Sequence, residues 1–299
     1  MTSLEIDVSI SVVIIHYRAP LWCSEAVSSV LASEEIATSV MVVDNSGDLP
    51  GMPDGVRVLH PTENVGYAGG ANLALRDWLT STQRYCFVAA HDLTVDPHTL
   101  ARLVAVAESN PDFGVIAPWF TPRVARVGEL GEVDGITEFT WVSGSGYLLR
   151  RELLEQIGLF DEDFGSYCED REICMRARIH GWRVGAVRGA DASSRGSAHQ
   201  DTAQVMMHGN QILLRIKYRA WKEAFKLVLY EIRSIPAEFI AALSPSRSTR
   251  DALRRARIHA KTLALASTKT VRWTIRGGQR GDPLSTQRQS SSSRRSTEQ

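Results

Sequence analysis

The residues best suited to chemistry are two adjacent carboxylates, Glu169 and Asp170, which follow an acidic, aromatic loop. The pattern after them predicts a helix to about His180, so both carboxylates stand at a helix N-terminus. Free backbone N–H groups and the helix dipole favour the ionised form there. One of the pair is therefore a candidate general base. The alternative is an acidic first turn that serves helix stability alone.

The first half of the chain alternates between strand and helix patterns. β-Branched apolar runs predict buried strands, and the stretches between them predict helices. The predicted strands cover residues 8–15, 39–43, 56–59 and 85–90. Two of the predicted helices cover residues 20–31 and 97–109, and another runs from the end of a Gly-rich loop at 64–72 to about residue 79. This order predicts an open, doubly wound, mostly parallel α/β sheet, in which ligands bind beyond the carboxyl ends of the strands.

Polar side chains stand at those strand ends: His16 and Tyr17 after the first strand, Asp44 after the second, His91 and Asp92 after the fourth. Asp44 can accept hydrogen bonds from a nucleobase or a ribose, although its Asp-Asn-Ser-Gly context is also typical of a turn. Asp92 can hold Mg²⁺ or Mn²⁺ beside a diphosphate, because hard cations take oxygen ligands. A turn or helix-capping role for Asp92 is the alternative.

The Gly-rich loop that begins at Asn64 and includes Gly66 can bring backbone N–H groups towards phosphates, although it matches no standard phosphate-loop pattern. Beyond Pro118 we expect a loop-like stretch at 123–138. A strand over 139–149 follows, interrupted by small residues around Gly144 that allow close approach of a ligand. A short helix, the acidic helix with Gly181 as its cap, and a strand at 182–187 complete the predicted sheet domain.

Composition narrows the function classes. The chain has 299 residues, 43% of them hydrophobic, so it can bury a full core. The four cysteines match neither a disulfide framework nor a zinc spacing and are expected to be reduced. Neither a signal peptide nor a spanning segment is expected, because no apolar run reaches about 18 residues. Residues 1–204 carry 28 acids and 15 arginines, so most of the basic charge lies in residues 205–299.

Six segments in order resemble the inverting family 2 glycosyltransferases of the GT-A fold, in particular the bacterial rhamnosyltransferase-like branch. They are SVVIIHY, VMVVDNSG, NVGYAGGAN, FVAAHDLTVDP, WVSGSGYLLRRELLEQIGLFDEDF and YCEDREICMRARIHGWRV, within about residues 8–190. The resemblance implies a nucleotide-diphospho-sugar donor and transfer, with inversion, to an acceptor hydroxyl. It also implies a metal-dependent leaving group, with Mg²⁺ or Mn²⁺ as cofactor.

Matched to the family's motifs, Asp44 resembles the acid that contacts the base of the nucleotide. Asp92 resembles the metal-binding Asp, and Asp170 the base that deprotonates the acceptor, with Glu169 helping to place it. The backbone near His16 and Tyr17 lines the same nucleotide pocket, which also includes Asn64, Gly66 and His91 in this interpretation. The acceptor or its sugars would contact Trp141, Gly144 and Tyr167, although aromatic residues more often belong to a core.

Two departures from the family pattern concern the metal. Ala90 and His91 precede Asp92 where relatives usually have Asn-Pro or an acid. Relatives often carry a His shortly after the strand that follows the acidic helix, where this chain has Arg195, with His199 a few residues later. Either His199 reaches the metal or diphosphate, or Arg195 supplies the positive charge, or the metal site is weakened.

We expect three parts: a catalytic domain at 1–204, a basic amphipathic helical extension at 205–276, and a disordered tail at 277–299. Apolar residues at helical spacing in the extension alternate with Lys and Arg, which suits docking on an anionic membrane or packing on the acidic body. No nucleic-acid-binding motif is present. The expected protein is a cytoplasmic glycosyltransferase on the inner face of the plasma membrane, with a dTDP- or UDP-sugar donor, rhamnose as first choice, and a lipid-linked or cell-envelope saccharide acceptor. The alternative is a non-catalytic nucleotide-sugar- or glycan-binding protein of the same fold.

Overall fold

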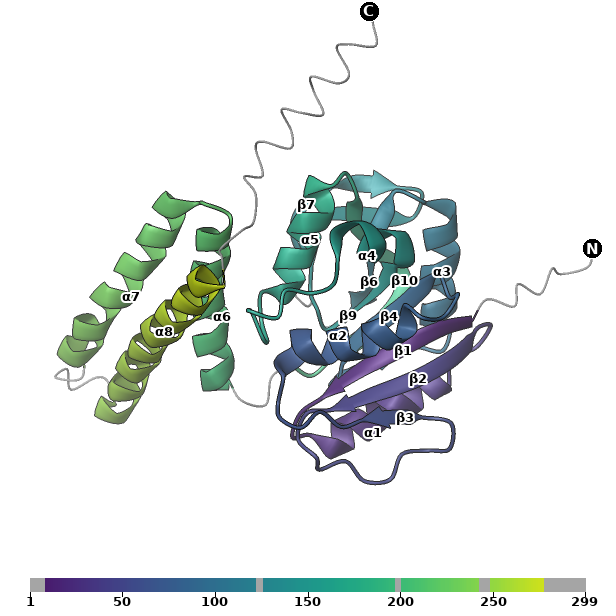
Figure 1. Ribbon diagram of the computed structural model, residues 1–299, viewed down its shortest axis with the longest axis horizontal. Coiled ribbons are helices and arrows are strands. Elements are labelled where there is room, and N and C mark those ends of the chain that lie inside the picture. The colour runs from purple at the N-terminus through teal and green to yellow at the C-terminus, as the bar shows by residue number, and fades with distance from the viewer. Residues whose placement is uncertain (1–8, 122–125, 197–199, 242–247, 277–299) are drawn as a thin grey trace, which may run out of the picture. The chain divides into compact units, whose positions relative to one another are not determined.

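The computed structural model describes residues 9–121, 126–196, 200–241 and 248–276, and the chain divides into two compact units. The sheet unit comprises the residues up to Gly165 and Glu169–Gly196, and the helical unit comprises Ser166–Cys168 and the residues from Ser197 onward. Figure 1 shows both units. The division after Gly196 precedes the boundary expected at residue 204, which lies within the first helix of the helical unit.

A single ten-stranded sheet organises the sheet unit, in the order β3-β2-β1-β4-β9-β6-β10-β8-β7, with β5 paired to β10. The strands are β1 Ser9–His16, β2 Ala37–Asp44, β3 Arg57–Leu59, β4 Tyr85–Ala90, β5 Leu93–Val95, β6 Phe113–Phe120, β7 Arg126–Val133, β8 Ile136–Val142, β9 Gly146–Arg150 and β10 Arg183–Ser194. Strands β3, β2, β1 and β4 are mutually parallel, as are β6 and β10. The predicted open α/β sheet is confirmed, with antiparallel strands β5, β7, β8 and β9 added to it.

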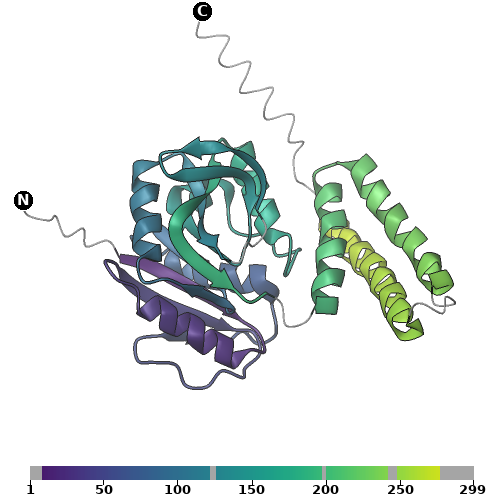
Figure 2. The same ribbon diagram turned by 180° about the vertical axis from the view of Figure 1, so that it is seen from behind.

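Helices cover both faces of this sheet, which makes it doubly wound. They are α1 Pro20–Leu31, α2 Gly66–Trp78, α3 Thr99–Ser109, α4 Arg151–Ile157 and α5 Glu169–Ile179. Helix α2 lies on the face turned to the viewer in Figure 1, whereas α1 and α3 lie on the face turned to the viewer in Figure 2. Pro20 begins α1, and Gly181, in the left-handed region at φ +90°, follows the end of α5, as the sequence predicted.

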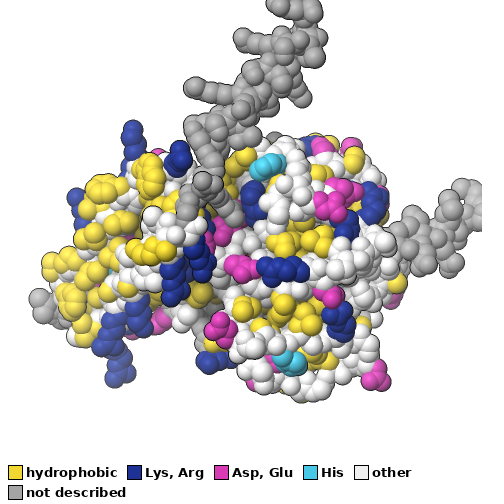
Figure 3. Space-filling model, in the orientation of Figure 1, with side chains coloured by type: hydrophobic (Ala, Val, Ile, Leu, Met, Phe, Trp, Pro, Cys, Tyr) yellow, Lys and Arg dark blue, Asp and Glu magenta, His cyan; other side chains and the backbone are white. Residues whose placement is uncertain are grey.

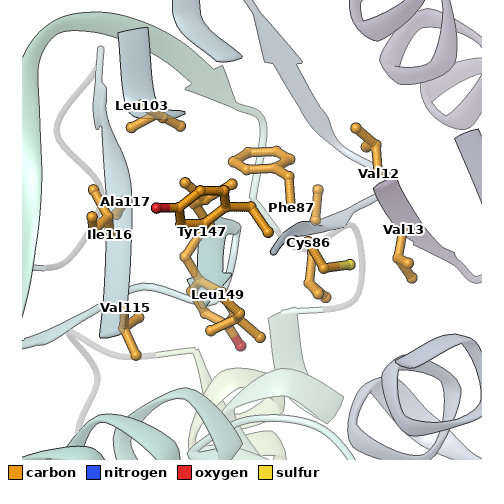
Figure 4. Close-up of a cluster of buried hydrophobic side chains, with 14 of the residues drawn as sticks. Val12, Val13, Cys86, Phe87, Leu103, Val115, Ile116, Ala117, Tyr147 and Leu149 are labelled. Atoms are coloured by element: carbon orange, nitrogen blue, oxygen red, sulfur yellow. The ribbon is translucent and has the colours of Figure 1, made fainter. Parts of the chain in front are cut away.

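The core lies where β9 fits between β4 and β6. Phe87 and Val88 of β4 are registered with Leu148 and Tyr147 of β9. All four side chains are buried, and Figure 4 shows Phe87 and Tyr147 among the apolar side chains of the neighbouring strands. This packing fixes β9 relative to β4, at whose end the polar residues stand. It therefore also fixes the turn that precedes β9.

Two local expectations were wrong. The stretch at 123–138, expected as a loop, contains strand β7 and the start of β8, joined by a turn in which Asp134 (φ 45°) and Gly135 (φ 83°) are left-handed. Asp-Gly with positive φ at both positions is a favoured two-residue hairpin turn. The single strand expected at 139–149 is two strands, β8 and β9, which separate at Ser143–Ser145 and join different partners.

Three helices form the helical unit: α6 Gln200–Lys217, α7 Trp221–Ala241 and α8 Thr249–Ile275. Pro236 lies inside α7. At the centre, Glu231 of α7 is buried and contacts Nδ1 of His208 on α6 at 3.0 Å and Nδ1 of His259 on α8 at 2.6 Å. Among the described helices, none combines the length and apolar character needed to cross a bilayer. The tail expected to be disordered lies outside the described residues.

Candidate active site

The carboxylate of Asp170 is held by two backbone N–H groups. Oδ2 accepts a hydrogen bond from the N–H of Gly144 at 3.0 Å, and Oδ1 accepts one from the N–H of Arg171 at 2.7 Å. The side chain is half-buried in the first turn of α5. Burial raises the pKa of Asp170 above its usual range, although both hydrogen bonds and the charge of Arg171 oppose the rise. A carboxylate in this state is a stronger base than an exposed one.

The turn that contacts Asp170 also connects to the candidate metal ligand. Within the turn, the Oγ of Ser145 lies 3.5 Å from the Oγ of Ser194 at the end of β10. The Ser194 hydroxyl donates to Oδ2 of Asp92 at 2.6 Å. The sequence predicted the candidate base Asp170 and the candidate metal ligand Asp92 separately. In the structure, a series of contacts through this turn and Ser194 connects them.

Tyr67, in the Gly-rich loop, contacts the same turn and was missed by the sequence analysis. Its hydroxyl donates to the carbonyl of Gly144 at 2.7 Å. Burial raises the pKa of Tyr67 well above its usual value, and the charges of Glu169, Asp170 and Asp92 raise it further. The pKa of this half-buried phenol is thus affected by all three carboxylates. The signal was the aromatic residue within an otherwise small-residue loop.

Asp44, the candidate nucleotide ligand, is the last residue of β2 and is almost fully buried. Its Oδ1 accepts hydrogen bonds from the N–H groups of Ser46 and Gly47 at 3.0 and 2.8 Å, and its Oδ2 accepts one from the N–H of Leu49 at 3.3 Å. Burial by itself would raise the pKa of Asp44, but these hydrogen bonds lower it, and the net pKa lies below the usual value. Asp44 thus shapes its own turn, and a carboxylate has further lone pairs for a ligand.

Two histidines lie side by side beyond β1 and β4. The ring of His16 is fully buried and meets the ring of His91 edge-on, with centroids 5.4 Å apart. Nδ1 of His91 lies 3.1 Å from the carbonyl of Ile15, to which it donates in the neutral tautomer, and burial lowers the pKa of His91. The ring of His91 also stacks on Trp22, with centroids 6.3 Å apart. Tyr17, also nominated for this pocket, is half-buried and lies under the guanidinium of Arg18.

One group of three potential metal ligands occurs in the described ranges: His16, Asp44 and Asp48, with ligand atoms within 4.8 Å of one another. Those atoms are already used within the chain, because Nε2 of His16 lies 2.7 Å from Oδ1 of Asp48 and Asp44 accepts backbone hydrogen bonds. We interpret this group as a hydrogen-bonded cluster that shapes the end of β1 and β2.

Asp92 fits a metal differently. Its Oδ2 accepts hydrogen bonds from Ser194 and from the N–H of Gly196 at 2.7 Å, whereas Oδ1 makes no hydrogen bond within the described residues. One carboxylate oxygen is therefore left for a hard cation that would take its other ligands from a diphosphate. His199, the second candidate ligand, lies outside the described residues.

The N-terminus of α2 is occupied by the chain itself. The side-chain oxygen of Asn64 accepts a hydrogen bond from the N–H of Gly66 at 2.9 Å, and the N–H of Ala68 donates to the carbonyl of Gly165 at 2.7 Å. A Cβ on Gly66 would come within 2.8 Å of the Gly165 backbone. In the described structure these glycines allow α2 to approach the loop that precedes α5.

The remaining nominated residues lie at the rim or in the core. The exposed Arg195 forms an ion pair with Glu25, and its guanidinium lies over the ring of Trp22 at 5.6 Å. Trp141 is half-buried beneath the guanidinium of Arg171 at 4.5 Å, and Tyr167 is half-buried in the left-handed conformation. Phe160 and Phe164, the two phenylalanines of the acidic loop, are buried.

Residues 90–274 match the family described as glycosyl transferase family group 2, and residues 11–126 match glycosyl transferase family 2. A low-salt glycan biosynthesis hexosyltransferase of Haloferax volcanii, Agl10, is 23% identical over 207 residues, which cover 61% of this chain and 66% of that relative. The chain thus matches just under two thirds of that relative's length.

Solved structures of glycosyltransferases share the fold. A mannosyltransferase from Pyrobaculum calidifontis, in complex with GDP-Man and Mn²⁺, superposes with a TM-score of 0.51 at 15% identity, covering 95% of this chain and 79% of that chain. S. aureus TarS 1-349, in complex with UDP, superposes with a TM-score of 0.51 at 16% identity, covering 91% and 92%. The likeness at these identities concerns the fold alone, and the predicted GT-A architecture is confirmed.

Proposed function

The chain belongs to glycosyl transferase family group 2 and is a glycosyltransferase, and on this premise we propose that it transfers a hexosyl group from a nucleotide-diphospho-sugar to a saccharide hydroxyl, with inversion and with Asp170 as the base. The observation that carries the proposal is the half-buried Asp170, fixed by two backbone hydrogen bonds and with a raised pKa. The donor proposed first is dTDP- or UDP-rhamnose.

The reaction balances with one base. The carboxylate of Asp170 takes the proton of the acceptor hydroxyl as its oxygen forms a bond to the anomeric carbon. The bond from that carbon to the diphosphate oxygen breaks on the opposite face, and the nucleoside diphosphate leaves. Attack and departure on opposite faces invert the anomeric configuration. Glu169, buried beside Asp170 at the start of α5, is proposed to help place the acceptor.

The donor is proposed to lie at the ends of β1, β2 and β4, with Asp44 accepting from the base or ribose. Mg²⁺ or Mn²⁺ bound at Asp92 would neutralise the charge of the leaving diphosphate. Oδ1 of Asp92 makes no hydrogen bond to the described part of the chain, which supports this assignment, and Ser194 and Gly196 orient the carboxylate by occupying its other oxygen. Arg195 and His199 stay proposed contacts of the diphosphate.

Asp170→Asn tests the proposal directly, because it removes the base while keeping the shape of the side chain. We expect loss of transfer, about a thousandfold or more, with donor binding preserved in a thermal-shift assay of dTDP- and UDP-sugars. Asp92→Ala should abolish the part of that thermal shift that requires Mn²⁺ or Mg²⁺. Transfer at the wild-type rate by Asp170→Asn would refute the assignment of the base.

The acceptor is proposed to be lipid-linked or part of the cell envelope, reached from the cytoplasmic face of a membrane. The support comes from α7. Its exposed apolar side chains Trp221, Phe225, Ile232 and Phe239 follow one another at spacings of four, seven and seven residues, which place them on one face of a helix. Exposed side chains of this size on one helix face are unusual unless they are covered by a partner or a membrane.

Charge on α7 favours an anionic lipid surface over a second protein copy. Lys222, Lys226 and Arg233 are exposed beside the apolar stripe, whereas the acidic Glu231 is buried. A symmetric pairing of two such faces would bring two rows of basic residues together. Figure 3 shows apolar side chains gathered on the helical unit with Lys and Arg at their edges. Interfacial helices have this distribution of apolar and basic residues.

A further inference from the structure

The chain enters the helical unit for three residues immediately before the helix that carries the candidate base. Residues Ser166–Cys168 belong to the helical unit, whereas the residues on both sides of them belong to the sheet unit. Tyr167 (φ 69°) and Cys168 (φ 71°) are both left-handed, and neither is a glycine. Two consecutive L-residues in this conformation are strained, so other interactions must hold them there.

Asn210 of α6 supplies those interactions. Its side chain is fully buried, and its Nδ2 donates to the carbonyls of Ser166 and Tyr167, both at 2.7 Å. Nζ of Lys269 on α8 lies 2.8 Å from Oδ1 of Asn210. Because an ammonium group can only donate, Lys269 fixes which end of the amide is the oxygen, and both amide hydrogens then face the two carbonyls.

A second contact comes from one turn earlier on the same helix. The thiol of Cys168 donates to the carbonyl of Met207 at 3.6 Å. Both left-handed residues are thus bound to α6, Tyr167 through its carbonyl and Cys168 through its thiol. The next residue of the chain begins α5.

We propose that Asn210 is a positioning residue for the transfer reaction, acting through the backbone of Tyr167 and Cys168 on the base that follows them. These residues are joined directly to the first turn of α5, so a change in their backbone angles is passed along the chain to Asp170. The inference rests on the proposed role of Asp170. Donor binding is assigned to residues of other elements, so a relaxed turn lowers kcat and leaves donor affinity intact.

Asn210→Asp tests this with an isosteric side chain. A carboxylate retains the interaction with Lys269 but cannot donate to the carbonyls of Ser166 and Tyr167. The matched control is Gln211→Glu, the same chemical change one residue along α6, where the side chain makes no hydrogen bond among the described residues. We expect kcat about ten- to a hundredfold lower for Asn210→Asp, with the donor KM unchanged within about twofold, and wild-type kinetics for the control.

A rescue experiment separates positioning from a general loss of folding. Glycine adopts the left-handed conformation without strain, so Cys168→Gly should restore most of the kcat lost in Asn210→Ala. Folded Asn210 variants with wild-type kcat would overturn the inference. A decrease in kcat that is accompanied by an equal decrease in donor affinity, and that Cys168→Gly does not rescue, would also overturn it. Asp170→Asn is measured alongside. If it retains transfer, the proposed base is wrong; if it is inactive while folded Asn210 variants keep wild-type kcat, the positioning role alone is wrong.

Discussion

The backbone N–H of Gly144 donates a hydrogen bond to Oδ2 of Asp170 across 3.0 Å, and the two residues touch closely enough that a Cβ on Gly144 would lie 3.1 Å from the Cβ of Asp170. The turn between β8 and β9 therefore meets the first turn of α5 without space for a side chain. The same Gly144 accepts the hydroxyl hydrogen bond of Tyr67 through its carbonyl. One residue thus connects the Gly-rich loop to the candidate base.

Gly144→Ala should therefore impair catalysis more than folding. At 3.1 Å the neighbouring atoms must shift by a few tenths of an ångström, which moves the Asp170 carboxylate. We expect kcat to fall about tenfold or more, because catalysis is sensitive to small misplacements of the base. Steady-state kinetics and thermal unfolding measure the two effects. Gly51→Ala, where no atom lies within 4 Å of the added Cβ, is the control and should behave as wild type.

The pH dependence of kcat should reflect the raised pKa of Asp170. The base works only when ionised, so activity falls as the pH drops through this pKa, and the acid limb should lie above 3.8, the ordinary value for Asp. The charge of Arg171 lowers the pKa of Asp170, so Arg171→Gln should move the acid limb to higher pH, whereas Arg171→Lys should leave it near the wild-type position. An acid limb that moves equally in both variants would contradict the electrostatic assignment.

The same raised pKa predicts the stability of the inactive variant. A carboxyl group with a higher pKa in the folded protein than in the unfolded chain binds its proton more tightly when folded, so its contribution to stability decreases as the pH rises through the folded pKa. Ionised Asp170 is therefore unfavourable at neutral pH. Asp170→Asn removes this charge but can accept only one of the two backbone hydrogen bonds, so its melting temperature at pH 7 should stay close to that of the wild type. A marked decrease in the melting temperature would mean that the hydrogen bonds outweigh the burial cost.

The sequence predicted most of the sheet because local patterns encode it. The strand ending at Ala90 was predicted at its observed bounds, and the helix beginning at Pro20 ends at Leu31 as expected. Strand β6 was missed. Strand β6 contains Pro118, which weakens a strand pattern. Pro118 is nevertheless registered with Val187 of β10, whereas β9 pairs with β6 at Val115 and Ile116.

The candidate site was predictable only as separate residues. Asp44, Asp92 and Asp170 each follow or begin a recognisable element, so their types and places were visible. Their connections depend on residues far apart in the sequence: Ser145 and Ser194 are 49 positions apart, and Tyr67 and Gly144 are 77 apart. Asp48, which bonds His16, is an exposed turn residue with no pattern of its own. Such pairs arise from tertiary packing, which no local pattern specifies.

Gly66 should be indispensable for stability. It is left-handed at φ +75°, and an added Cβ would lie 2.8 Å from backbone atoms of Gly165, which cannot rotate away as a side chain can. Gly66→Ala should lower the free energy of unfolding by about 2–4 kcal/mol. Gly55→Ala is the matched control, because Gly55 is also left-handed at φ +85° but has no atom within 4 Å. It should cost only about 1 kcal/mol, so the difference in chemical denaturation isolates the clash with Gly165.

The apolar face of α7 should bind anionic membranes. Replacing Trp221 and Phe225 with Ser should lower the partition coefficient on phosphatidylglycerol vesicles, measured by sedimentation, at least about thirtyfold. The reason is that two large apolar side chains contribute roughly 2 kcal/mol or more to the free energy of membrane binding. Leu21→Ser, which removes an even more exposed apolar side chain from α1, is the control and should not change binding. Lys222→Glu with Lys226→Glu should weaken binding to these vesicles and have little effect with neutral phosphatidylcholine. Equal binding by all variants would exclude α7 as the docking face. If the wild-type protein is a dimer and the changes at Trp221 and Phe225 convert it to a monomer, the face belongs to a contact with a second copy.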